Sequence, residues 1–296
     1  MHQPIYSRKA NGKLLLTGEY LVLDGANALA IPTCFGQTMT ISKSECMTWE
    51  ARDVFNEIWM QYRHNSEEIL DLFLNDLFKN IGSEHTYQSF EFKTKVDFPR
   101  EWGLGTSSTL IALIADFYKV NPYILNSKLF SGSGYDIACA FASKPITYQV
   151  NDFNNPNIQE VELKKIITDC IYFVYLGEKQ NSKEEIRKYH STKTIRQSTI
   201  DDVSRITQNI LENQTLYHWI EQLEKHEELI SKAIGLKKIS ETKLLGLPYF
   251  SKSLGAWGGD FAMILTNTKL DEVREDLMKF NLETVISYDD MIFRHR

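Results

Sequence analysis

The chain has 296 residues, of which 43% are hydrophobic and 24% are charged, enough for one large domain or two ordinary domains with the composition of a globular protein. A formal net charge of −6 argues against nucleic acid as a partner, because nucleic-acid binding favours a basic surface. The sequence lacks an apolar run long enough to span a bilayer and a signal-peptide core at its N-terminus, so we expect a cytoplasmic protein with no membrane contact.

The first half of the chain reads mainly as strands. Residues 13–33 contain strand-like runs with a turn at Asp24-Gly25, a dipeptide typical of hairpins. Residues 36–50 and 87–98 alternate apolar with polar side chains, which predicts half-buried strands.

Two helices are expected among these strands. Helical periodicity covers residues 66–82, and an apolar helix is predicted from about Ser107 to Tyr118. The cysteines and histidines add no metal site or disulfide, because their spacing matches neither. We expect reduced, buried thiols at Cys34, Cys46, Cys139 and Cys170.

The second half reads as a separate unit of strands and helices. It contains a buried strand, two helices interrupted near Asn213, a second buried strand, an amphipathic helix and a final strand. These elements correspond to residues 170–177, 200–234, 261–266, 269–280 and 283–289. This order predicts an α+β sandwich of the ferredoxin-like type. We place the domain boundary after residue 165, giving domains 1–165 and 166–296.

The stretch Trp102-Gly-Leu-Gly-Thr-Ser-Ser-Thr-Leu110 places two glycines and four hydroxyl residues directly before the apolar helix. Gly103 and Gly105 let the backbone approach a ligand closely. Ser107 and Ser108 fall in the first helical turn, where free amides favour an anion. The same pattern also serves as a plain helix cap, and it is not a P-loop, because no Gly-Lys-Ser/Thr ends it.

A second glycine-rich loop lies within residues 251–265, with three glycines in five residues ahead of a buried strand. Such a loop either folds over a ligand without side-chain bulk or forms a tight turn.

A carboxylate, Asp136, lies near the start of an apolar helix, where an unpaired charge is costly. It is either a helix cap or a group that accepts a proton or pairs with a lysine. Lys13, which leads an apolar strand, is the candidate partner, although lysines at strand starts are usually solvated.

In this order the motifs resemble those of the GHMP kinase superfamily, which includes galactokinase, homoserine kinase, mevalonate kinase and phosphomevalonate kinase. The segment GKLLLTGEYLVLDGANALAIPT is similar to the first family motif, WGLGTSSTL to the phosphate-loop motif and SLGAWGGD to the third motif. GEYLVLDG and GSGYDIA are closest to the phosphomevalonate and mevalonate kinase branch. The resemblance runs from about residue 9 to the C-terminus.

The resemblance implies an N-terminal domain like ribosomal protein S5 domain 2, a ferredoxin-like C-terminal domain, and ATP with Mg²⁺ in the cleft between them. It implies ATP contacts at Gly103, Leu104, Gly105, Thr106, Ser107, Ser108, Gly255, Ala256, Gly258 and Gly259. Ser107 would lie near Mg²⁺.

The resemblance also implies the catalytic pair and the acceptor pocket. Asp136 matches the family aspartate that faces the substrate hydroxyl, and Lys13 matches the lysine that pairs with it. Glu19 and Tyr20 fall where relatives line the acceptor pocket. Ser182 and Lys183 fall where mevalonate-type kinases place a Ser/Thr-Lys pair.

The sequence departs from the family pattern in three places. Trp102 stands where a small residue is usual, and Trp257 interrupts the third motif; each indole either stacks on the base or narrows the site. The family's second Mg²⁺ ligand, a glutamate, has no counterpart, because residues 119–134 contain no acidic residue. Asp116 is the nearest acidic substitute.

The cations between residues 177 and 196 suit an anionic small-molecule acceptor, although interleaved glutamates also fit a solvated helix. We therefore predict an ATP-dependent kinase of the mevalonate pathway in isoprenoid biosynthesis, phosphomevalonate kinase ahead of mevalonate kinase, present as a monomer or homodimer. The alternatives are a kinase acting on a sugar or amino-acid hydroxyl and a non-catalytic ATP-binding relative.

Overall fold

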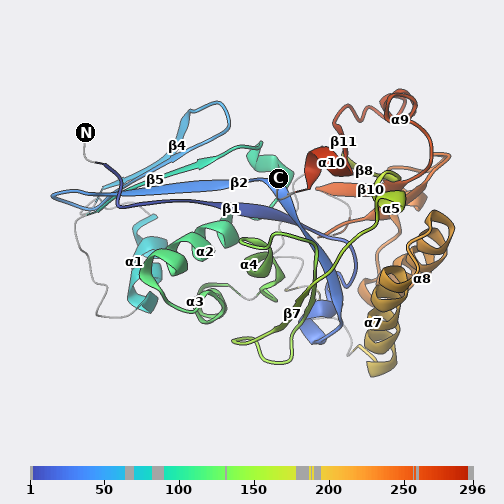
Figure 1. Ribbon diagram of the computed structural model, residues 1–296, viewed down its shortest axis with the longest axis horizontal. Coiled ribbons are helices and arrows are strands. Elements are labelled where there is room, and N and C mark those ends of the chain that lie inside the picture. The colour runs from blue at the N-terminus through green and yellow to red at the C-terminus, as the bar shows by residue number, and fades with distance from the viewer. Residues whose placement is uncertain are drawn as a thin grey trace.

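The computed structural model describes residues 3–63, 70–81, 90–130, 132–177, 187, 189, 195–255, 257 and 260–292. The architecture is mixed α and β, with two sheets and helices packed against them (Figure 1). None of the described helices is long and apolar enough to cross a membrane.

The first sheet has seven strands in the described chain and is built around the long strand β2. Strand β1 pairs antiparallel along one edge of β2, and β5 and β6 share the other edge. Strands β3 and β4 extend the sheet beyond β5, and β7 extends it beyond β6. The strands are β1 (Tyr6–Leu15), β2 (Ala28–Lys43), β3 (Thr48–Arg52), β4 (Ile58–Arg63), β5 (Phe90–Val96), β6 (Ile146–Gln149) and β7 (Asn157–Glu160).

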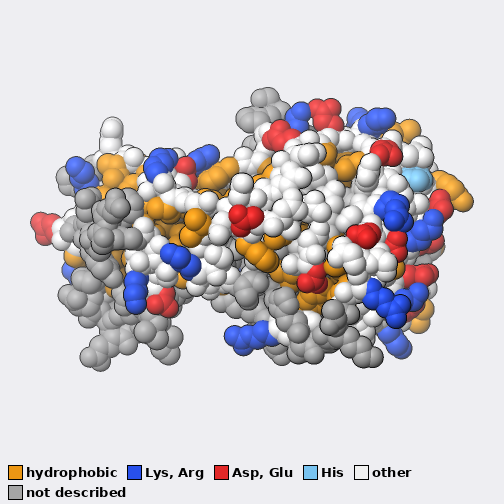
Figure 2. Space-filling model, turned by 90° about the horizontal axis from the view of Figure 1, so that it is seen from below, with side chains coloured by type: hydrophobic (Ala, Val, Ile, Leu, Met, Phe, Trp, Pro, Cys, Tyr) orange, Lys and Arg blue, Asp and Glu red, His pale blue; other side chains and the backbone are white. Residues whose placement is uncertain are grey.

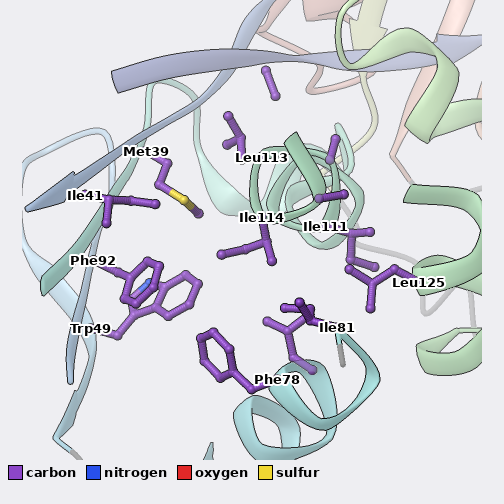
Figure 3. Packing of buried hydrophobic residues seen from close by; sticks show 14 of the residues in the cluster. Met39, Ile41, Trp49, Phe78, Ile81, Phe92, Ile111, Leu113, Ile114 and Leu125 are labelled. Atoms are coloured by element: carbon purple, nitrogen blue, oxygen red, sulfur yellow. The ribbon is translucent and has the colours of Figure 1, made fainter. Parts of the chain in front are cut away.

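Helices cover one face of this sheet (Figure 1). They are α1 (Leu70–Ile81), α2 (Thr106–Tyr118), α3 (Pro122–Leu129) and α4 (Tyr135–Cys139). Figure 3 shows the core between these helices and the sheet, where Ile114 of α2 points toward Phe92 of the sheet and Ile111 of α2 lies beside Leu125 of α3. Trp49 stacks on Phe92 with ring centroids 4.9 Å apart. Because α2 is apolar on most of its surface, this burial fixes the helix and therefore the loop that precedes it.

The second sheet has the strand order β11-β8-β10-β9, and its neighbouring strands are antiparallel. Its elements are α5 (Lys165–Thr168), β8 (Ile171–Tyr175), α7 (Gln197–Glu212), α8 (Leu216–Ile234), β9 (Phe250–Ser253), β10 (Phe261–Leu265), α9 (Leu270–Met278), β11 (Val285–Ser287) and α10 (Tyr288–Met291). Both central strands are buried on two faces. Ile171 and Phe173 of β8 point toward the first sheet, whereas Tyr172 and Val174 pack in the core that includes α9. This explains their continuous apolar sequence.

One hydrophobic core joins the two sheets. It contains Leu14 and Ile31 of the first sheet, Phe173 and Met263 of the second, and Trp219 of α8. The predicted boundary at residue 165 falls at the start of α5, between the last strand of the first sheet and the first strand of the second.

The structure confirms most of the predicted elements and corrects two. The helix from about Ser107, the interrupted helix pair and the buried strands at residues 170–177 and 261–266 are present. The strand expected over residues 36–50 is divided between the end of β2 and the start of β3, which residues 44–47 separate. The expected hairpin at Asp24-Gly25 is wrong. Strands β1 and β2 do pair, but Leu21–Asp24 form a short 3-10 helix, η1, that ends at Gly25 in a left-handed conformation.

Figure 2 shows acidic and basic side chains interspersed over one face of the molecule. That face therefore carries no extended field of one sign.

Candidate functional site

The phosphate-loop motif lies directly on strand β1. The pairing of β1 with β2 shifts register between Asn11 and Lys13, and a Cβ on the intervening Gly12 would lie 2.9 Å from the carbonyl oxygen of Leu104. The Lys13 amide donates to that same oxygen at 3.1 Å. The absence of a side chain at Gly12 therefore lets the loop contact the strand.

The loop has the backbone that close approach to a ligand requires. Gly103 and Gly105 both have left-handed φ angles, 65° and 94°, and α2 begins at Thr106. Ser107 is exposed and Ser108 is buried. The Ser108 amide donates to the Gly105 carbonyl oxygen at 3.1 Å, whereas the amides that begin a helix, here those of Thr106 and Ser107, have no partner in a preceding turn. These amides and the exposed Ser107 hydroxyl can donate hydrogen bonds to a phosphate. The hydroxyl oxygen can also ligate a cation that prefers oxygen ligands.

Lys13 and Asp136 contact this loop from different elements. The Lys13 ammonium donates to the carbonyl oxygen of Gly103 at 2.9 Å. Asp136 accepts from the Ile137 amide at 3.1 Å through Oδ1 and from the Ser108 hydroxyl through Oδ2. The structure thus brings both predicted catalytic residues to the phosphate loop.

Lys13 and Asp136 do not bond directly. In the part of the chain that the structure describes, no ion pair with an N···O distance within 4.0 Å joins these two side chains. Both charges nevertheless act on the thiol of Cys139. Burial raises the pKa of this thiol, Asp136 raises it further and Lys13 lowers it.

Tyr20 occupies a strained turn near the junction of the two sheets. The Leu21 amide donates to the carbonyl oxygen of Glu19 at 2.6 Å, and Tyr20 has a φ angle of 60°. This γ-turn is a rare conformation for a residue other than glycine. It places the Tyr20 ring 5.4 Å from the ring of Tyr189, in a buried group that also contains Trp257.

Glu19 is fully buried among charged residues of α8 and β9. Its Oε1 accepts from the Lys252 ammonium, which also lies 3.4 Å from Oε1 of Glu227. Burial raises the pKa of Glu19 to about 7, although Lys252 opposes the shift. His226 accepts from the Gly18 amide at 2.9 Å through Nε2, and burial lowers its pKa well below 6.5, so it is neutral. We call Glu19, His226, Glu227 and Lys252 the junction cluster.

The third motif meets the phosphate loop through Asp260. A Cβ built on Gly103 would lie 2.1 Å from Oδ2 of Asp260, so the carboxylate rests against the glycine. Gly255 has a left-handed φ of 60°. Five predicted site residues lie outside the described chain: Ser182, Lys183, Ala256, Gly258 and Gly259.

The two tryptophans that depart from the family pattern pack against protein. Trp102 lies edge-on to Phe35 and Phe261, with ring centroids 5.2 and 5.6 Å away. Trp257 is 4% exposed and packs beside Tyr20 and Tyr189. Trp257 therefore fills the space beside the Tyr20 turn.

Sequence reasoning missed Gly12, Lys252 and the role of Ser108 as a partner of Asp136. Gly12 lies at the irregularity in β1, where the register against β2 shifts between Asn11 and Lys13. Lys252 is 0% exposed, although lysines are almost never fully buried unless they are paired. Only the fold shows that Glu19, far away in sequence, supplies its partner.

Asp116 is engaged away from the loop. Arg8 lies 2.7 Å and Lys119 3.2 Å from Oδ1 of Asp116, and the Tyr6 hydroxyl donates to its Oδ2 at 2.9 Å. Within the part of the chain that the structure describes, no group of three or more His, Cys, Asp or Glu side chains is placed to hold a metal ion by itself.

Sequence comparison identifies no relative: no protein-family model matches the chain, and no curated protein matches it. Structural comparison does. Phosphomevalonate kinase from Streptococcus pneumoniae, in complex with phosphomevalonate and AMPPNP, matches with a TM-score of 0.74 at 17% identity, covering 96% of this chain and 100% of that one.

Two other kinases match over nearly the same length. Mevalonate kinase from Methanococcus jannaschii has a TM-score of 0.72 at 14% identity, covering 100% of this chain and 99% of that one. Galactokinase from Lactococcus lactis, complexed with galactose, has a TM-score of 0.67 at 13% identity, covering 93% and 89%. The resemblance inferred from the motifs is thus confirmed at the level of the fold. The chain has the fold of the GHMP kinases, among which it resembles phosphomevalonate kinase and mevalonate kinase.

Proposed function

We propose that the chain is an ATP-dependent kinase that transfers the γ-phosphoryl group to a hydroxyl or phosphate of a small anionic molecule. One observation carries the proposal: a glycine-rich loop at a helix N-terminus contacts both a lysine and an aspartate. The fold shared with three small-molecule kinases supports it. In this proposal residues 1–165 form the S5 domain 2-like domain and residues 166–296 the ferredoxin-like domain. The strand order β11-β8-β10-β9 supports the second assignment.

ATP would bind between these domains, with its phosphates on the amides of residues 103–108 and near the Gly255 loop. Phosphoryl transfer depends mainly on positioning and on neutralising charge. Mg²⁺ on the phosphates would supply part of that neutralisation. The chain supplies the rest through the α2 amides, the Ser107 hydroxyl and the ammonium of Lys13, which the contact with Gly103 already holds at the loop.

Asp136 would act on the acceptor. Its carboxylate is oriented by the Ser108 hydroxyl and the Ile137 amide, so it keeps one geometry while it accepts a proton from an attacking hydroxyl. A phosphate acceptor is already ionised near neutral pH and needs no base. For such an acceptor, Asp136 would orient the nucleophile.

We favour phosphomevalonate over mevalonate as the acceptor. The cations between residues 177 and 196 support this choice, because they suit an acceptor with a carboxylate and a phosphate. The solved phosphomevalonate and mevalonate kinases match over nearly the same length, so both acceptors fit the fold. Tyr20 would line this pocket. Its strained turn supports that role, because strained backbone is common at ligand sites.

The test is ADP release from Mg-ATP with mevalonate, 5-phosphomevalonate, diphosphomevalonate, galactose and homoserine in turn, with Asp136→Asn in parallel. We expect turnover on 5-phosphomevalonate, reduced by about 10²-fold in Asp136→Asn, because the acceptor phosphate loses the group that orients it. Turnover only on galactose or homoserine would keep the kinase and exclude the mevalonate-pathway substrate. ATP binding with no turnover on any acceptor would favour a non-catalytic relative.

A further inference from the structure

Asp260 brings a negative charge to the loop that we propose binds phosphates. Its two carboxylate oxygens would lie 2.1 and 2.7 Å from a Cβ on Gly103. A carboxylate in that place would lie next to the phosphates of a nucleotide bound to the same loop. Because like charges repel at short range, nucleotide binding there requires a cation between them.

Carboxylates already make the region around the loop negatively charged before a nucleotide binds. Burial raises the pKa of Tyr135 well above 10, and the charges of Asp136, Glu19 and Asp260 raise it further. Lys13 is the cation seen to contact the loop, through the Gly103 carbonyl. A triphosphate adds several more negative charges. Lys13 alone does not neutralise them, so a divalent cation is needed as well.

Asp260, Asp116 and Asp136 all have partners within the protein already, so Asp260 differs from the other two carboxylates in its position against Gly103. Asp116 is held by Arg8, Lys119 and Tyr6. Asp136 accepts from Ser108 and Ile137. The connection from residue 119 to residue 134 contains no acidic residue.

We propose, on the basis of the kinase function above, that Asp260 supplies the carboxylate ligand of the Mg²⁺ carried by the nucleotide. Mg²⁺ in nucleotide sites is bound by one or two carboxylates together with phosphate oxygens and waters. The exposed Ser107 hydroxyl is the second protein oxygen available to it. Since the described residues hold no metal cluster of their own, the cation binds with the nucleotide and only weakly without it.

The experiment measures AMPPNP binding by calorimetry, once with excess Mg²⁺ and once with EDTA. In the wild-type chain we expect Mg²⁺ to tighten binding. In Asp260→Asn we expect that gain to shrink by at least about tenfold, the scale seen when groups that support a metal site are removed. Affinity in EDTA is expected to stay the same or rise, because a repelling charge has been removed. Asp260→Glu, which keeps the charge, is expected to recover part of the gain.

Asp116→Asn is the matched control and should leave both affinities unchanged. Equal tightening of both affinities in Asp260→Asn would show that the carboxylate only repels, and no change in either would show that it lies outside the site; both overturn the proposal. A wild-type chain that binds no AMPPNP in either buffer overturns the kinase function itself. If Asp260→Asn fails to fold, Mn²⁺ titration of the wild-type chain followed by electron paramagnetic resonance decides: tight binding without nucleotide contradicts the proposal.

Discussion

The phosphate loop and the junction cluster both hold charged side chains, but these side chains differ in their burial and in their partners. At the loop, Lys13 and Asp136 are half-buried and bond to backbone or hydroxyl groups. In the junction cluster, Lys252 and Glu19 are 0% exposed and bond to each other.

The difference separates charges that can act on a ligand from charges that hold the fold. A buried charge that loses its partner is costly, because neither water nor another group compensates it. A half-buried charge that bonds only to backbone or hydroxyl dipoles can still pair with a charge or dipole of a substrate. We therefore expect substitutions in the junction cluster to change mainly stability and substitutions at the loop to change mainly binding and turnover.

The largest effect is expected from Lys252→Met. It leaves two buried carboxylates, Glu19 and Glu227, without their shared cation. We expect the free energy of unfolding to fall by about 3–5 kcal/mol, as measured by urea denaturation.

The double variant Lys252→Met with Glu19→Gln separates the charge from the packing. It should recover a measurable part of the loss, because it removes one of the stranded carboxylates. A single variant as stable as the wild type would contradict the buried pairing.

A smaller effect is expected from Gly12→Ala. Its Cβ would lie 2.7 Å from Oγ1 of Thr33 and 2.9 Å from the Leu104 carbonyl oxygen, so the phosphate loop must move. We expect a loss of about 1–3 kcal/mol of stability together with weaker AMPPNP binding. Gly132→Ala is the control, because a Cβ there meets no atom within 4 Å. Equal binding by both variants would show that the loop does not depend on its contact with β1.

A pH-dependent effect is expected from Glu19. Burial raises its pKa from 4.5 to about 7. Between these values the folded chain keeps a proton that the unfolded chain has released, so this group lowers stability as the pH rises through that range. His226 acts in the opposite direction below 6.5, because it protonates only on unfolding.

Glu19→Gln isolates the carboxyl group, since His226 is present in both chains. Between pH 5 and pH 8, we expect the wild type to lose about 1–3 kcal/mol relative to Glu19→Gln. Parallel stability curves would exclude a shifted pKa at Glu19.

The smallest effect is expected from Asp116→Asn. Its ion pairs with Arg8 and Lys119 involve partners that are 43% and 77% exposed, and exposed pairs contribute no more than about 1 kcal/mol. Thermal unfolding should show a change of that size or less, with turnover unchanged. A large loss of turnover would place Asp116 in the site.

The sequence predicted most of the fold and the position of the loop, because these depend on local patterns. The apolar helix α2 and the buried strands β8 and β10 can be read from local runs of apolar residues. The roles of Glu19 and Lys252 could not be read that way, because residues 233 positions apart meet only in the folded chain.

The same limit applies to Asp260 and Ser108. Asp260 ends a motif whose glycines dominate its appearance, and its contact with Gly103 arises from the approach of two distant loops. Ser108 resembles its neighbour Ser107 in sequence, yet one turns inward to Asp136 and the other faces solvent. The rotation of α2 on the sheet decides between them.

The core between the two sheets has a consequence for motion. Leu14, Phe98 and Leu104 pack in the same cluster as Phe173 and Trp219, so swinging the sheets apart would expose apolar surface on both sides. Opening by a rigid hinge is therefore disfavoured. We expect the two halves to melt together in one calorimetric transition, and we expect ligands to enter by rearrangement of loops while the sheets stay in place.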